Sequence, residues 1–221
     1  MASLIRNLER FNRKERFYLL AWALGLVEMR DEKPLPTFTL GAEFRKSLND
    51  LLGLRVPSQK VYVAMDYHID WVYASLCLTR DGDAKAKYAL DTDTISATPQ
   101  DVDLLIAYQA GDVWPMIMLE AKGHSNLTNA QPASKARRLA AVFGGEGTNW
   151  RGIGVRPYFV MASSRGESTA LRCDDWPNWM VGTDHRPYWL PMHMPEHLLR
   201  VARTDKESTD SWASWKITNA K

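Results

Sequence analysis

The first third of the chain has a helical pattern of hydrophobic and polar positions. A helix is expected from about Ser3 to Glu28, and Pro34 and Pro36 then break the pattern. A second helix is expected from about Leu40 to Leu52, where apolar residues recur on one face. We therefore expect an N-terminal helical part that leads into the core of the fold.

Strand patterns dominate the middle of the chain. Residues Val61 to Leu78 are rich in β-branched and aromatic residues and alternate over part of their length, which predicts a strand. The polar stretch from Arg80 to Gln100 is expected to be a loop or an edge excursion. A β-hairpin is expected over Asp101 to Gly123, then a helix over Gln131 to Phe143 and a buried strand over Pro157 to Ala162. This order predicts an α/β (or α+β) fold, with a central mixed sheet flanked by helices.

The predicted hairpin places charged side chains among aliphatic ones. If Gly111-Asp112 is a two-residue loop, as glycine in its first position favours, Asp103 faces Glu120 across the two strands. Lys122 points to the same side as Glu120, because side chains two apart on a strand share a face. Asp101 shares that face with Asp103 but is expected to lie in the preceding loop. Facing carboxylates repel unless they share a proton or a divalent cation, so the hairpin predicts one of these two arrangements.

Few oxygen ligands with room for water suit Mg²⁺ or Mn²⁺ better than zinc. The arrangement of Asp103 at the head of one strand and Glu120-Ala121-Lys122 at the end of the next resembles the active site of the PD-(D/E)XK nuclease superfamily. The order of elements from Leu40 to Ala162 also resembles the core of its restriction-endonuclease-like fold. The resemblance implies a metal-dependent nuclease that hydrolyses DNA phosphodiester bonds with Mg²⁺, for which Mn²⁺ could substitute.

The resemblance also implies roles for individual residues. The metal ligands would be Asp103, Glu120 and the backbone carbonyl of Ala121, and Lys122 would be the catalytic lysine. Many members add a glutamate from the first core helix, and Glu43 matches it here. Because many such enzymes dimerise to cut both strands, the resemblance allows a homodimer.

The predicted helix after the hairpin carries a row of polar residues. Gln131, Lys135 and Arg138 follow i, i+4, i+7 spacing, separate from the apolar positions. Gln131 also matches the glutamine of a glutamine–tyrosine pair found in phage-exonuclease-like and RecB-type members, although Lys135 stands where the tyrosine would be. The row is expected either to bind phosphates of the substrate or to be a solvated charged face.

Asp66, His68 and Asp70 share the other face of the strand predicted from Val61, and they could form a second acidic cluster or a hydrogen-bonded structural set. The chain of 221 residues suits one domain, divided into an N-terminal helical extension (1–36), a catalytic core (37–163) and a Trp-rich C-terminal extension (164–221). The tryptophans after Ser163 are expected to anchor this extension by packing or to stack on bases: Trp176, Trp179, Trp189, Trp212 and Trp215.

Composition narrows the class of protein. Lys and Arg number 28 against 26 Asp and Glu, so the net charge of +2 does not indicate a histone-like nucleic-acid binder, and any phosphate-binding surface must be local. Two cysteines, Cys77 and Cys173, suggest reduced thiols in a cytoplasmic protein. The longest apolar run, Tyr18 to Val27, is too short for a spanning helix, so no membrane anchor is expected. Two alternatives stay open: a non-catalytic nucleic-acid-binding module on the same fold, and an unrelated α/β enzyme acting on small phosphates.

Overall fold

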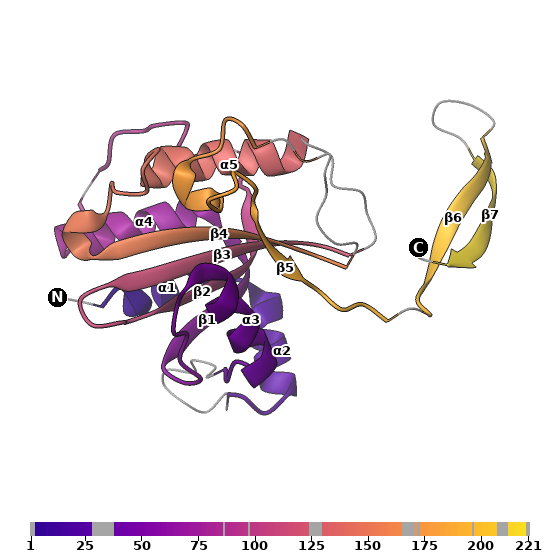
Figure 1. The fold of residues 1–221 in the computed structure, drawn as a ribbon, viewed down its shortest axis with the longest axis horizontal. Helices are drawn as coiled ribbons and strands as arrows, with labels where there is room; N and C mark the ends of the chain where they lie inside the picture. The colour runs from indigo at the N-terminus through magenta and orange to yellow at the C-terminus, as the bar shows by residue number, and fades with distance from the viewer. Residues whose placement is uncertain are drawn as a thin grey trace.

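A five-stranded mixed sheet forms the centre of the protein, shown in Figure 1 as a computed structural model. The structure describes residues 3–27, 38–85, 87–96, 98–123, 130–164, 171, 173–195, 197–206 and 212–219. The strands, in spatial as well as chain order, are β1 (Val61–His68), β2 (Asp101–Tyr108), β3 (Trp114–Lys122), β4 (Val155–Ser163) and β5 (Tyr188–Pro191). Neighbouring strands from β1 to β3 are antiparallel, and those from β3 to β5 are parallel. The predicted α/β class with a mixed sheet is therefore confirmed.

Helices cover both faces of this sheet (Figure 1). The helical elements are α1 (Leu4–Phe11), α2 (Glu15–Ala23), α3 (Ala42–Leu52), α4 (Ile69–Asp81), α5 (Ala130–Phe143) and two 3₁₀ turns, η1 (Arg151–Ile153) and η2 (Asn178–Met180). Met116 and Met118 of β3 join the buried cluster under α4 and α5, whereas Ile117 and Leu119 join the cluster under α3. Alternate residues of β3 thus face different layers, as a strand requires.

The β2–β3 hairpin has the predicted register. Ala110 and Val113 exchange both backbone hydrogen bonds, with N···O distances of 2.8 and 3.1 Å, around a two-residue loop. Gly111 opens this loop with φ of +63°, a conformation that glycine adopts without a steric penalty. The ladder then runs as far as Leu104 opposite Leu119. The next pair in this register is the predicted carboxylate pair.

Two of the predicted elements are each divided into two separate elements in the structure. The strand expected over 61–78 ends at His68, and α4 follows at once, because its apolar residues recur with helical spacing on a buried face. The single helix expected over 3–28 is interrupted after α1. There the Asn12 side chain accepts a hydrogen bond from the backbone N–H of Lys14 at 3.2 Å, which ends one helix before the next begins.

The predicted C-terminal extension has two parts. β5 joins the sheet beside β4, so this stretch belongs to the central layer. Beyond it, β6 (Leu199–Lys206) and β7 (Trp212–Asn219) form a separate antiparallel hairpin that projects from the body in Figure 1. It lies on the side of the molecule where β3 and β4 end.

The tail tryptophans divide in the same way. Trp176 is buried in the hydrophobic cluster under α4 and α5, and the partly buried Trp179 and Trp189 pack against that cluster. The expectation of packing anchors is therefore confirmed for these three. Trp215 lies on the projecting hairpin and is 65% exposed, whereas the side chain of Trp212 lies outside the described residues.

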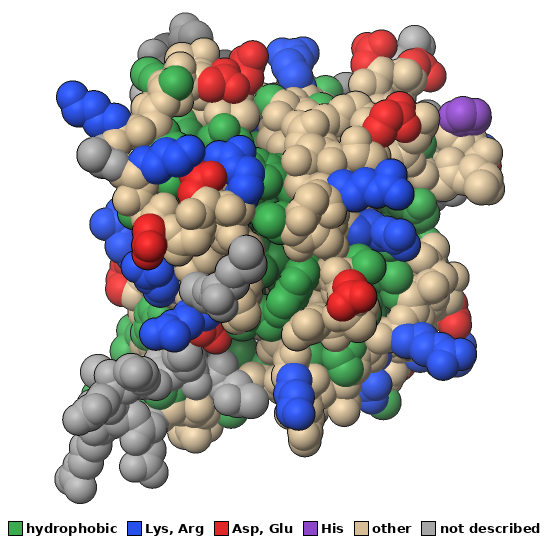
Figure 2. Space-filling view, turned by 90° about the vertical axis from the view of Figure 1, so that its left-hand side faces the viewer, with side chains coloured by type: hydrophobic (Ala, Val, Ile, Leu, Met, Phe, Trp, Pro, Cys, Tyr) green, Lys and Arg blue, Asp and Glu red, His purple; other side chains and the backbone are tan. Residues whose placement is uncertain are grey.

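Charges of both signs are mixed on the face that contains the β2–β3 loop. Figure 2 views this face and shows Lys and Arg side chains beside Asp and Glu, with hydrophobic side chains between them. The pattern agrees with the small net charge of +2. No helix in the described part of the chain is both long and apolar enough to cross a bilayer.

Substitution of Gly111 by alanine tests the turn that sets the register. A Cβ at this position would meet no atom within 4 Å, so the penalty comes from the backbone conformation alone. We expect the free energy of unfolding in urea to fall by about 1 kcal/mol. Gly145→Ala is the matched control, because a Cβ there also meets no atom and φ is not positive. Equal losses in the two variants would contradict the role assigned to this turn.

Candidate active site

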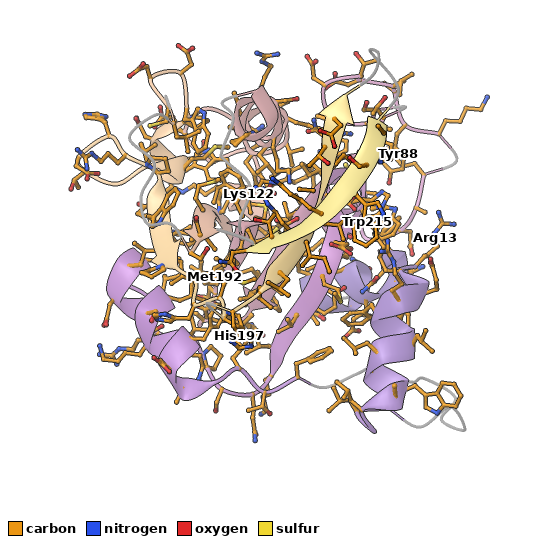
Figure 3. All side chains as sticks on the ribbon, turned by 90° about the vertical axis from the view of Figure 1, so that its right-hand side faces the viewer. Arg13, Tyr88, Lys122, Met192, His197 and Trp215 are labelled. Carbon is orange, nitrogen blue, oxygen red and sulfur yellow. The ribbon has the colours of Figure 1, made fainter. Side chains whose placement is uncertain are left out.

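One edge of the sheet gathers the predicted catalytic residues. β3 and β4 end there at Lys122 and Ser163, and the antiparallel β2 begins there at Asp101. Figure 3 views the molecule from this side, where Lys122 is labelled. In open α/β sheets, ligands bind beyond the carboxyl ends of the strands. The edge is therefore the part of this fold where a site is expected.

Asp103 ends the β2–β3 ladder with its side chain. Its Oδ2 accepts a hydrogen bond from the backbone N–H of Ala121 at 2.6 Å, in place of a backbone carbonyl of β2. Val102 stays paired with Tyr67 of β1. β3 thus separates from β2 at this point, and the Asp103 carboxylate bridges the two strands.

Glu120 is the most buried charged residue of the site. Its side chain has 0% exposure and lies between two ammonium groups. Lys135 of α5 donates to Oε2, and Lys122 Nζ lies 3.0 Å from Oε1. The Lys122 contact is within ion-pair distance but outside hydrogen-bond geometry, so Oε1 has no hydrogen-bond partner among the described residues. One buried acceptor oxygen is therefore open to a further ligand.

The environment of Asp103 disfavours its charge. Burial raises the pKa of the Asp103 carboxyl above its usual value, and the like charge of Glu120 raises it further. The hydrogen bond from Ala121 and the charges of Lys135 and Lys122 oppose this shift, but the net direction is upward. The carboxylate pair is therefore a place that favours an added proton or cation.

The oxygen atoms at this edge suit an ion such as Mg²⁺, which keeps several water ligands, better than an ion that takes all its ligands from protein side chains. In the described parts of the chain, no three His, Cys, Asp or Glu side chains come together as ligands for one metal ion. Asp103 and Glu120 supply two carboxylates, and the carbonyl of Ala121 points to the same side as its N–H, toward β2. Mg²⁺ commonly binds through one or two carboxylates and keeps several waters. This small oxygen set, with the open Oε1, fits that preference.

Glu43 lies away from the carboxylate pair. It occupies the first turn of α3, whose Leu48 packs in the cluster formed by Leu119 on one face of the sheet. Glu120 points to the opposite face, because it follows Leu119 on the strand. Glu43 itself is exposed. The structure therefore does not bring together the predicted glutamate of the first core helix and the other predicted ligands.

The polar row predicted on α5 is not a solvent-facing phosphate site. Lys135 and Arg138 are 5% and 8% exposed. Arg138 contacts the carboxylate of Asp70 on α4 and donates to the carbonyl of Thr98 at 3.2 Å. The expectation of an exposed basic face is therefore corrected: each of these two cations contacts a carboxylate inside the protein. Gln131 belongs to α5, but its side chain lies outside the described residues.

The Lys135–Glu120 contact has a signal in the sequence that the prediction overlooked. Lys135, Leu139 and Val142 follow i, i+4, i+7 spacing, which places the lysine in line with the buried stripe of α5. On β3, Glu120 follows Met118 with the two-residue period of the face under α5. When the spacing of an acid on a strand and of a base on a helix matches that of the buried residues of each element, a buried ion pair is indicated.

The acidic residues near β1 have separate surroundings. His68 Nε2 lies 3.3 Å from Oδ1 of Asp101, whose Oδ2 receives Lys14 at 2.8 Å. Asp70 belongs to α4 and pairs with α5, and Asp66 remains in β1 with φ of +49°. They do not form a second acidic site. Asp101 is the first residue of β2, not part of a loop, and its carboxylate contacts Lys14 and His68.

The variant Asp103→Asn tests the buried charge. A folded-state pKa above the ordinary value means that Asp103 favours the fold below its ordinary pKa and that this contribution is lost as pH rises through the raised value. Asparagine keeps an oxygen for the N–H of Ala121. We therefore expect the difference in unfolding free energy, variant minus wild type, to become more positive from about pH 4 to neutrality.

Urea unfolding at a series of pH values measures this difference. Asp175→Asn is the control, because it removes an exposed carboxylate outside the site. A difference for Asp103→Asn that stays constant with pH, or that matches the control, would contradict a raised pKa for this half-buried carboxyl.

Comparison with known proteins does not assign the chain to a family. No protein-family model, no curated protein and no solved structure matches it. The chemistry of the site is therefore inferred from its own residues.

Proposed function

We propose that this protein is a metal-dependent nuclease that hydrolyses DNA phosphodiester bonds at the edge of its sheet. The observation that supports this most directly is the hairpin register, which brings Asp103, Glu120 and Lys122 together. The open oxygen of Glu120 gives a divalent cation a ligand that no hydrogen bond occupies. Two carboxylates with a lysine beside them suit phosphoryl chemistry better than a purely structural role.

The order of elements supports a restriction-endonuclease-like core. α3, β1, β2, β3, α5 and β4 follow one another in the sequence expected for that core. The chain adds α4 between β1 and β2, and β5 beyond β4. We propose that these are additions to the core and do not disturb the edge that carries the site.

Each residue has a defined task in the proposed reaction. Asp103, Glu120 and the carbonyl of Ala121 would hold Mg²⁺ or Mn²⁺, which when bound activates a water and neutralises charge on the phosphate. Lys122 is 18% exposed, and its ammonium would position the water and stabilise charge on a phosphate oxygen. The water would lose a proton to solvent as its oxygen forms a bond to phosphorus and the opposite P–O bond breaks, and the leaving oxygen would keep the electron pair and take up a proton from solvent.

A groove beside α5 offers contacts for the DNA backbone. Its volume is about 290 Å³, and its lining includes Thr98, Gln100, Ser134 and Arg137. Gln100 donates to Ser134 at 2.9 Å, which joins the start of β2 to the first half of α5 near the site. Arg137 is exposed, unlike the next residue. We propose that Arg137 and these hydroxyl and amide groups bind phosphates of the DNA backbone.

One observation favours a second candidate, a non-catalytic nucleic-acid-binding module on the same fold. Glu120 has 0% exposure and each of its oxygens faces a lysine, as in a structural ion cluster. A site of that kind would bind DNA without cutting it. Metal binding and cleavage separate the two candidates.

Glu120→Ala and Lys122→Ala test the nuclease proposal. We expect the wild type to cut plasmid or linear DNA with Mg²⁺ or Mn²⁺, and each variant to lose about 10³-fold in rate, because one loses a metal ligand and the other the charge beside the water. Lys46→Ala is the control for general charge loss, since Lys46 lies on α3 with 76% of its side chain exposed.

Other outcomes point elsewhere. Cleavage that survives both substitutions would exclude this site as the catalytic one. DNA binding without cleavage, and without metal binding in calorimetry, would indicate the binding module. Hydrolysis of p-nitrophenyl phosphate without any DNA cleavage would indicate an enzyme that acts on small phosphates.

A further inference from the structure

Lys135 occupies the position of a built-in cation at the carboxylate pair. It projects from the second turn of α5, is 5% exposed, and contacts Oε2 of Glu120. Its charge also acts on Asp103. Both proposed metal ligands therefore lie within the field of one buried ammonium group.

We propose that Lys135 is the resident counter-ion of the carboxylate pair and must leave Glu120 before a divalent cation binds. The inference rests on the proposed function, because it takes Asp103 and Glu120 as the metal ligands. It assigns Lys135 a role that differs from that of Lys122, although both lysines contact the same carboxylate.

The two lysines differ in freedom. Lys122 has 18% side-chain exposure and no hydrogen bond to Oε1, so it can turn toward solvent at low cost. Lys135 has 6% side-chain exposure and a direct contact to Oε2. A divalent ion and an ammonium on the same carboxylate repel strongly at low dielectric. Although Oε1 is open, a divalent cation bound there is therefore disfavoured for as long as Lys135 stays on Oε2.

This competition couples metal loading to the substrate. Mg²⁺ gains ligands from substrate phosphates, which add to the carboxylates of the protein. Phosphate oxygens also give the released ammonium of Lys135 a new partner. In the absence of DNA, the metal must displace Lys135 without phosphate ligands of its own and without a phosphate partner for the released ammonium. We therefore expect the carboxylate pair to bind a divalent cation more weakly in the absence of nucleic acid than in its presence.

Calorimetric titration of the full chain with Mn²⁺ alone tests this directly. Lys135→Met removes the charge but keeps a long side chain, and we expect it to bind Mn²⁺ at least about tenfold more tightly than the wild type. Lys135→Arg keeps the charge, and we expect it to bind no more tightly than the wild type. A gain in Mn²⁺ affinity in Lys135→Met but not in Lys135→Arg would show that the positive charge at this position, and not the volume of the side chain, controls metal binding.

Arg138→Met is the matched structural control. Arg138 is the other buried cation of α5, but its carboxylate partner is Asp70 on α4. We expect this variant to lose thermal stability without any change in Mn²⁺ affinity. For Lys135→Met, we expect a lower Tm without metal and a larger rise in Tm with Mn²⁺ than in the wild type. If Lys135→Met does not fold, Lys135→Gln is titrated in its place, with the same expectation.

The outcomes separate this inference from the proposed function. Equal Mn²⁺ affinity of wild type and the folded Lys135→Met or Lys135→Gln variant overturns the counter-ion role and leaves the metal site intact. An equal gain in affinity in Arg138→Met overturns it as well, because the effect would then be a general loosening of α5. Absence of Mn²⁺ binding in the wild type and in every folded variant overturns the metal site, and with it both proposals.

Discussion

A charged group without access to water is the constraint on which this molecule depends. Glu120 is the last buried residue of β3, and its side chain has 0% exposure. An ionised carboxylate in such surroundings is costly unless cations and hydrogen bonds surround it. Lys135 and Lys122 meet that need from α5 and from β3 itself. The docking of α5 on the sheet and the charge of Glu120 therefore require each other.

The same constraint connects the fold to chemistry. A buried ion pair is weak evidence for stability, since apolar replacements of similar volume often stabilise a protein. An apolar residue at position 120 would simply extend the row formed by Met116 and Met118. The chain instead places a second carboxylate, Asp103, beside the first and raises its pKa by burial. Such a costly arrangement is typical of functional sites.

The parts of the site that depend on neighbouring residues could be predicted from the sequence. The two-residue loop that begins at Gly111, together with the period of the strands, determines which side chains face one another, so the pairing of Asp103 with Glu120 follows locally. The spacing of Lys135 on α5 and of Glu120 on β3 indicates that both side chains are buried, but it does not say that α5 covers the face to which Glu120 points. The place of Glu43 likewise depends on which face of the sheet α3 covers. The boundary between β1 and α4 was obscured because β-branched residues occur in both.

A crystal structure of the protein grown with Mn²⁺, with anomalous difference density measured for manganese, would show whether the carboxylate pair binds the metal. We expect one peak about 2.0–2.3 Å from an oxygen of Asp103 and an oxygen of Glu120, with Nζ of Lys135 withdrawn from Glu120. A peak elsewhere, or no peak at saturating Mn²⁺ with Lys135 still in contact with Glu120, would contradict it.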